Sequence, residues 1–131
     1  MTLATPQLSS VRPRAPVYYR GIPVGMVSGA SLSRDGTAAH VHVLIEPRYA
    51  RLVRLGSQFW NASGVDINLS LFKGLDINID SLRSLVAGGV VFATPDAESA
   101  PAKDGSIFVL HDKPQKDWLA WMPKIPLPGG Q

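Results

Sequence analysis

Residues 34–45 read Arg-Asp-Gly-Thr-Ala-Ala-His-Val-His-Val-Leu-Ile, a tight-turn signal followed by alternating apolar and other side chains. The Asp-Gly pair accepts the positive φ angles that a hairpin turn requires. In an extended strand successive side chains point to opposite faces, so Val41 and Val43 share one face while His40 and His42 share the other. The stretch therefore predicts a hairpin whose second strand buries one face.

Further β-prone runs lie on both sides of this hairpin and are separated by glycine and proline. Val, Ile and aromatic residues favour extended structure, whereas Gly and Pro mark turns. The other runs predicted as strands are residues 17–20, 24–32, 58–61, 65–71, 75–79, 90–94 and 106–110. Pro47 begins a stretch of helical spacing that ends before Gly56 and predicts one short helix. We therefore expect an all-β domain, a small closed β-barrel of about seven strands with one short helix.

The composition is poor in charge and rich in turn residues. Of the 131 residues, 45% are hydrophobic and 18% charged, with 12 Gly and 11 Pro, whereas about a quarter of the residues in an average soluble protein are charged. The net charge of +3 and the scattered basic residues argue against nucleic-acid binding, and the absence of cysteine excludes disulfides. Arg48, Arg51 and Arg54 would form one ridge on a helix, which we interpret as a solvated face, with a phosphate-binding patch as the alternative.

Both ends of the chain have the composition of linkers. We expect an N-terminal tail or linker over residues 1–15, a barrel domain over 16–111 and a C-terminal linker to a neighbouring module over 112–131. Trp118 and Trp121 would then pack against that neighbouring module, with a membrane interface as the alternative. No secretory signal is visible, and the longest apolar run is less than half the roughly 20 residues that span a bilayer.

No motif for catalysis or cofactor binding can be assembled from the residues. His40 and His42 lie on one strand face, and His111 could in principle complete a metal site. No carboxylate stands at a fixed spacing from them, so we interpret His40 and His42 as solvent-facing. Residues 76–80 resemble the opening of a calcium loop but are followed by Ser81 where the loop needs glycine. We therefore expect no enzyme activity, no metal and no cofactor.

Several blocks of sequence occur in one order and at natural spacings. They are residues 16–25 (Pro-Val-Tyr-Tyr-Arg-Gly-Ile-Pro-Val-Gly), 49–54, 57–64, 81–82 and 88–95. Together they resemble an MCE (mammalian cell entry) domain of the paraquat-inducible protein B type. The resemblance covers about residues 16–110 and leaves both tails outside.

This resemblance implies the MCE fold, a small β-barrel that usually assembles into a hexameric ring. Stacked rings form a periplasmic tube that carries phospholipid between the inner and outer membranes. The implied location is the periplasm, as part of an inner-membrane-anchored protein whose N-terminal transmembrane helix and further domains are absent from this chain. The implied partners are phospholipid, copies of the same chain in a ring, other MCE modules and membrane components, and no nucleic acid.

One segment carries the residues that the resemblance assigns to function. Residues 81–89 match the loop that projects into the centre of the ring, so Leu82, Leu85 and Val86 would line an apolar pore and contact lipid. Gly88 and Gly89 would form the hinge that allows the return turn. Lipid tails need an apolar lining, and leucines exposed without a partner would promote aggregation. The alternative is that these leucines plug one end of the barrel.

We therefore predict a ring-forming module of a periplasmic lipid-transport conduit, with an apolar central pore and no catalysis. The alternative is a β-barrel scaffold or interaction module that handles no lipid.

Overall fold

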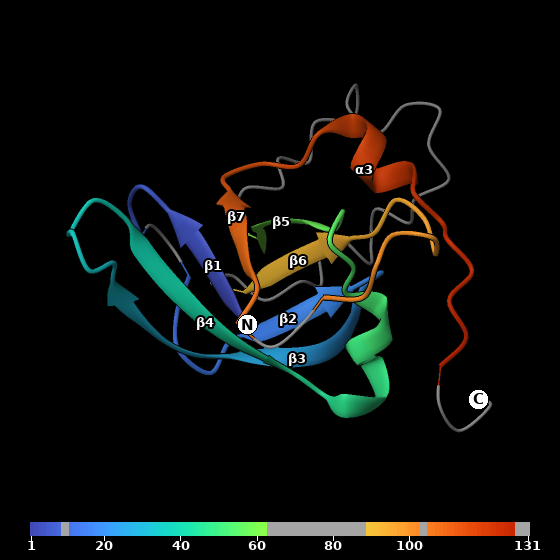
Figure 1. Cartoon of the computed structure of the whole chain (residues 1–131), viewed down its shortest axis with the longest axis horizontal. Helices are drawn as coiled ribbons and strands as arrows, with labels where there is room; N and C mark the ends of the chain where they lie inside the picture. The colour runs from blue at the N-terminus through green and yellow to red at the C-terminus, as the bar shows by residue number, and fades with distance from the viewer. Residues whose placement is uncertain (9–10, 63–88, 103–104, 128–131) are drawn as a thin grey trace.

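A computed structural model describes residues 1–8, 11–62, 89–102 and 105–127 of the chain. Within these residues, seven strands close into one barrel in the order β1-β4-β3-β2-β6-β5-β7 (Figure 1). The strands are β1 (Thr2–Thr5), β2 (Pro16–Tyr19), β3 (Ile22–Leu32), β4 (Ala39–Ile45), β5 (Gln58–Asn61), β6 (Val90–Ala93) and β7 (Ile107–His111). The predicted fold class, a small closed β-barrel, is confirmed.

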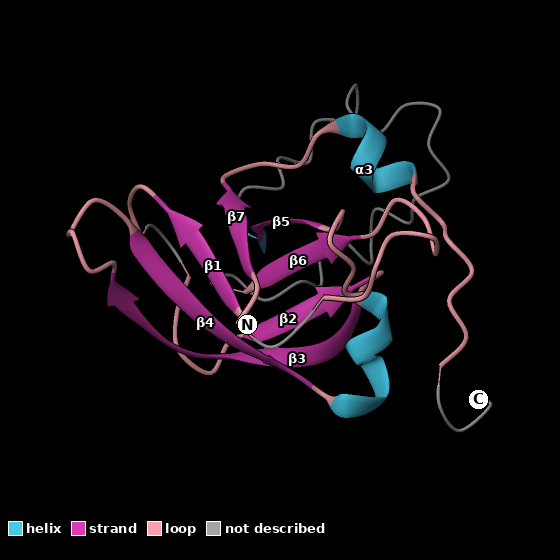
Figure 2. Cartoon of the chain, viewed as in Figure 1, coloured by secondary structure: helices cyan, strands magenta, loops and turns pink. Residues whose placement is uncertain are grey.

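Short helical segments flank the barrel in the part of the chain that the structure describes (Figure 2). The helix predicted from Pro47 is a 3-10 helix, η1 (Pro47–Leu52), and an α-helix, α3 (Lys116–Ala120), follows β7. Neither these nor any other helix among the described residues has the length and apolarity needed to cross a bilayer.

The barrel mixes antiparallel and parallel pairings. β1 pairs antiparallel with β4 and parallel with β7, so the first and last strands close the sheet. β6 pairs antiparallel with β5 and parallel with β2. A closed sheet has no edge strand with unsatisfied backbone groups, so strands as short as four residues are stable in it.

The predicted hairpin forms between β3 and β4. In β4, Val41 and Val43 are buried whereas His40 and His42 are partly exposed, so the alternation of faces is confirmed. Asp35 fixes the turn, because its Oδ1 accepts hydrogen bonds from the side-chain hydroxyls of Ser33 and Thr37 at 2.8 and 2.7 Å. These hydrogen bonds lower the pKa of Asp35 to about 2.

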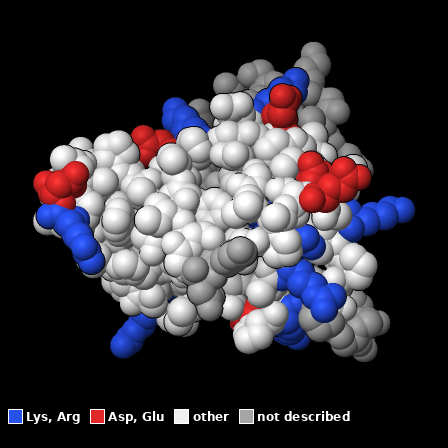
Figure 3. All heavy atoms as spheres, in the orientation of Figure 1, with Lys and Arg blue, Asp and Glu red and all other residues white. Residues whose placement is uncertain are grey.

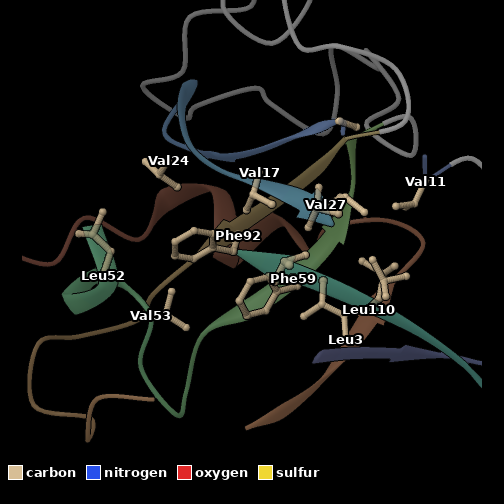
Figure 4. Packing of buried hydrophobic residues seen from close by; sticks show 14 residues of the cluster. Leu3, Val11, Val17, Val24, Val27, Leu52, Val53, Phe59, Phe92 and Leu110 are labelled. Atoms are coloured by element: carbon tan, nitrogen blue, oxygen red, sulfur yellow. The ribbon is translucent and has the colours of Figure 1, made fainter. Parts of the chain in front are cut away.

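A row of four aromatic rings crosses the neighbouring strands β2, β6, β5 and β7. Ring centroids are 5.0 Å apart between Tyr19 and Phe92, 5.1 Å between Phe92 and Phe59, and 5.0 Å between Phe59 and Phe108. Phe59 and Phe92 are completely buried and lie at the centre of the core in Figure 4. Apolar side chains from all seven strands and from η1 surround this aromatic row, so the interior of the barrel is filled.

The expectation of a tail over residues 1–15 differs from the structure, which places Thr2–Thr5 in the barrel as β1. Leu3 is fully buried, and Val11 and Ala15 belong to the same core. The backbone of residues 11–15 is also tied down, since Val27 N–H donates to the Ala15 carbonyl at 2.8 Å. Sequence reasoning missed β1 because Thr2–Thr5 contains a single large apolar residue, Leu3, and so shows no alternating pattern.

The C-terminal segment, expected to be a linker, packs against the barrel of its own chain. Trp118 of α3 is buried and lies over Trp60 on the outer face of β5, with ring centroids 5.8 Å apart. The ring centroids of Trp118 and His111 are 4.9 Å apart. Trp60 Nε1 has no hydrogen-bond partner among the described residues, so its burial offsets part of the gain from stacking. Trp118 therefore packs against β5 of its own barrel.

We predict that Leu3→Ala lowers the free energy of unfolding by about 2–5 kcal/mol, because it removes a fully buried side chain and leaves a cavity. Leu8→Ala, which changes a partly exposed leucine in the same N-terminal stretch, should alter it by about 0.5 kcal/mol or less. Denaturation in urea measures both. Equal small effects would show that the first strand is not part of the barrel.

We also predict that Trp118→Ala destabilises the chain by about 3 kcal/mol, the lower end of the range for buried aromatic residues. The matched control is Trp121→Ala, which changes a half-buried tryptophan in the same segment and should cost clearly less. Thermal unfolding followed by tryptophan fluorescence compares the two variants. A Trp118 variant as stable as the Trp121 variant would mean that the packing of α3 on β5 does not stabilise the barrel.

Candidate functional site

Strands β5 and β6 form an antiparallel hairpin whose connection comprises residues 62–89. Asn61 pairs with Val90, and beyond this pair Ala62 N–H donates to the Gly89 carbonyl at 3.0 Å. We call Ala62 and Gly89 the stem. Both residues are buried and joined by this hydrogen bond, so the two ends of the connection leave the barrel side by side.

The predicted pore residues belong to the connection that this stem closes. Leu82, Leu85, Val86 and Gly88 lie outside the residues that the structure describes. Gly89 lies inside them and is buried, with its carbonyl group in the stem. Its predicted role as a hinge stays a prediction.

Side chains pack against both faces of the stem hairpin. On the inner face Phe59 stacks on Phe92, and on the outer face Trp60 stacks on Trp118. A register slip of one residue would move each set of side chains to the wrong face and lose both contacts. The hairpin therefore holds the ends of the connection in fixed positions.

A buried polar chain ties the other end of the same hairpin to η1. Thr94 Oγ1 donates to the Leu52 carbonyl at 2.6 Å and lies 2.7 Å from Ser57 Oγ, which therefore donates to it. Ser57 Oγ in turn accepts from Arg54 N–H at 2.9 Å. Each buried hydroxyl thus has a partner, as a stable interior requires.

A cleft of about 490 Å³ lies beside η1. We call it the lateral cleft. The barrel contributes Tyr19, Arg20, Ile22 and Val24, η1 contributes Tyr49 and Leu52, and the C-terminal segment contributes Met122, Pro123, Ile125 and Leu127. Figure 4 shows Val24 and Leu52 at the end of the core away from Leu3 and Leu110.

The polar groups of the lateral cleft are phenols and a guanidinium group. Burial raises the pKa of Tyr19, and the positive charge of Arg20 partly opposes this rise. Arg48 lies over the Tyr49 ring, 4.6 Å from its centroid, and forms an exposed ion pair with Glu46 at 3.8 Å. Figure 3 shows basic side chains gathered over η1.

The three histidines do not meet in one place. His42 lies between two hydroxyls, with Nε2 2.9 Å from Ser31 Oγ and Nδ1 3.5 Å from Thr2 Oγ1. His111 lies on β7, where Nε2 is 3.2 Å from Gln58 Oε1. Over residues 1–8, 11–62, 89–102 and 105–127, no three His, Cys, Asp or Glu side chains form a group that could hold a metal ion.

The three arginines predicted to form a ridge make mostly local contacts. Arg54 donates from Nε to the Arg51 carbonyl at 2.7 Å and from Nη1 to the Ser99 carbonyl at 3.3 Å. Arg54 therefore joins η1 to the loop after β6, and Arg48 contacts Tyr49 of the lateral cleft.

Sequence reasoning missed the lateral cleft because its walls come from three distant segments. One signal was present in the sequence: Ile125 and Leu127 alternate with Lys124 and Pro126, and the structure packs both aliphatic side chains against the core. The prolines in this stretch argued for a linker, because proline cannot donate a hydrogen bond to a sheet.

Known proteins match more of this chain than the sequence blocks that resemble an MCE domain. The model of the MlaD protein family matches residues 1–70, which include β1 to β5. The "Lipophilic envelope-spanning tunnel protein B" of Escherichia coli (strain K12) is 38% identical over 128 residues, 98% of this chain. The "Probable intermembrane transport protein" of Haemophilus influenzae is 37% identical over 109 residues, 82% of this chain.

The chain spans only 14% and 12% of the length of these two relatives. Both alignments and the family match nevertheless take in most or all of the barrel that the structure describes. The family match begins at residue 1, so the N-terminal strand that sequence analysis placed in a tail lies within the matched segment. Because the family model accounts for more than half of the residues, the chain belongs to the MlaD family of MCE-domain proteins.

Proposed function

We propose that this chain is one module of a conduit that carries lipid through the cell envelope, and that copies of the barrel surround the lipid path as a ring. The names of the two relatives, a lipophilic tunnel protein and an intermembrane transport protein, support transport. In this proposal the module acts by providing a path and performs no catalysis.

The observation that supports assembly into a ring is the filled interior of the barrel. Val17, Phe59 and Phe92 occupy the inside of the barrel and are almost completely inaccessible to solvent. A closed sheet of about eight strands is just wide enough for its own side chains. A lipid chain therefore has no route through one barrel, and a conduit requires a space enclosed by several barrels.

We propose that the connection 62–89 lines this central space. The stem fixes both of its ends on one rim of the barrel, so every copy in a ring would present the connection at the same place. Leu82, Leu85 and Val86 then form the apolar lining that contacts phospholipid, with Gly88 and Gly89 as the hinge. Acyl chains would move along this lining by partition from water into apolar surroundings.

The finer features follow from the resemblance to the paraquat-inducible protein B type. They are a hexameric ring, a periplasmic location within an inner-membrane-anchored protein, stacking with other MCE modules, and a contribution to the integrity of the outer membrane. The isolated module would bury little surface at each contact with another copy, so ring formation is expected above all in the longer protein.

The scaffold alternative is supported by exposed apolar side chains on the outer surface of the barrel. Leu44, Ile107 and Val109 are 59%, 63% and 58% exposed on β4 and β7, and the face over these strands in Figure 3 is largely free of charged groups. Side chains of this kind suit contact with another protein surface. Such a contact would serve a ring or a scaffold, so the oligomeric state and lipid capture distinguish the two functions.

We predict that the ectodomain of the longer protein, measured by light scattering, is a closed oligomer. Head-to-tail contacts between identical subunits close into rings when the rotation between them permits. A strictly monomeric ectodomain would contradict the conduit and favour the scaffold.

We predict that a photo-crosslinking residue at position 85 of the longer protein captures phospholipid in cells. The same residue at Ser99, in the partly exposed loop beyond β6, is the control and should capture none. Leu85→Asn should leave the melting temperature nearly unchanged while it blocks lipid passage, because a polar ring interrupts the apolar path.

If Leu85 instead belongs to the barrel core, position 85 captures no lipid and Leu85→Asn costs several kcal/mol. A core substitution to a smaller residue costs about 2–5 kcal/mol, and an amide buried without a partner adds to this loss. That result would support the alternative in which the leucines plug the barrel.

A further inference from the structure

The lateral cleft lies at the end of the barrel away from the stem. In the parallel pair of β2 and β6, Val17 stands beside Val90, next to the stem, whereas Tyr19 stands beside Phe92, two residues further along. Leu52, which lines the cleft, binds Thr94 just after the end of β6. The cleft and the stem therefore lie at opposite ends of the β2–β6 pair.

The base of the cleft is apolar. Val24 and Leu52 are 1% and 5% exposed, and the C-terminal segment adds the aliphatic side chains of Ile125 and Leu127. The barrel is closed and offers no strand edge, and Pro123 and Pro126 have no N–H group to donate, so this segment does not extend the sheet. The segment lies against the barrel and leaves an apolar space beside it.

Arg20 supplies positive charge to the cleft from an unusual backbone position. Tyr19 pairs with Ile22, so Arg20 and Gly21 are the two central residues of a tight turn. Both have positive φ, 54° and 82°. The first of these positions favours Asn, Asp or Gly, and an arginine there is uncommon. A residue kept in an unfavourable conformation suggests a use beyond the turn itself.

We propose that the lateral cleft binds a single acyl chain whose anionic end group pairs with Arg20. The volume of about 490 Å³ falls in the range of small-molecule sites, about 300–1,000 Å³. The lining residues include one guanidinium group and two phenols but no carboxylate, so the cleft is complementary to a negative charge. Arginine matches the geometry of both carboxylates and phosphates.

This site does not depend on the ring, because the barrel, η1 and the C-terminal segment of one chain supply all of its walls. The anionic group could be the carboxylate of a free fatty acid or the phosphate of a membrane lipid. The shared chemistry is an acyl chain that ends in an anion, and the probes below separate its two sources.

The test measures binding to the 131-residue chain by native mass spectrometry and by titration calorimetry. The probes are palmitate, 1-palmitoyl-lysophosphatidylglycerol and the neutral 1-palmitoylglycerol, each kept below the concentration at which it forms micelles. We expect a one-to-one complex with at least one anionic probe and much weaker binding of the neutral probe. Binding of palmitate alone would identify a carboxylate site, and binding of the lysophospholipid alone would identify a phosphate site.

Arg20→Asn is the decisive variant, because asparagine tolerates a positive φ and should leave the turn intact or more stable. It should weaken binding of the anionic probe about tenfold or more, the effect of losing a charged hydrogen bond. Arg34→Asn, which changes an exposed arginine in the β3–β4 turn, is the matched control and should bind normally.

A second pair of variants tests the apolar wall independently of charge. Ile22→Asn should weaken binding, whereas Leu55→Asn, at a similarly exposed aliphatic residue outside the cleft, should not. The proposal is wrong if no anionic probe binds, if the neutral probe binds equally well, or if each variant behaves like its control. Because one chain suffices for this measurement, its failure leaves the pore and ring proposal untouched, and the reverse also holds.

Discussion

The aromatic row Tyr19–Phe92–Phe59–Phe108 is the contact on which the rest of the molecule depends. It joins four adjacent strands that are distant in sequence, and it fills the space inside the closed sheet. Because aromatic side chains bury large apolar areas, a few of them can stabilise strands of four or five residues. The same row fixes β6 against β5, and thereby determines where the connection 62–89 leaves the barrel.

The β5–β6 hairpin connects two structurally distinct ends of the module. The stem closes one end, while the hydrogen-bonded chain from Ser57 through Thr94 to Leu52 anchors η1 at the other. Tyr19 belongs both to the aromatic row and to the wall of the lateral cleft, so core and cleft share a side chain. A rigid centre thus holds the stem and the lateral cleft in fixed positions relative to the barrel.

The elements that the sequence predicts well are those whose information is local. The alternation in residues 39–45 and the Asp35-Gly36 turn determine one hairpin almost alone, and the structure confirms it. β1 could not be found this way, because its register depends on β4 and β7, whose residues lie far along the chain. The docking of Trp118 and the lateral cleft likewise depend on segments that meet only in the folded barrel. For Leu82, Leu85 and Val86 the family resemblance remains the source of the assignment.

The stem also affects how freely this module can change over evolutionary time. A connection whose two ends are already held together adds little conformational cost when it is lengthened, since each doubling of its length costs only about 0.6 kcal/mol. By this measure, lengthening the chain between Ala62 and Gly89 would cost the barrel far less than a change at Phe59 or Phe92. Repeated copies of such a barrel could diverge in the segment that they present while they keep the same core.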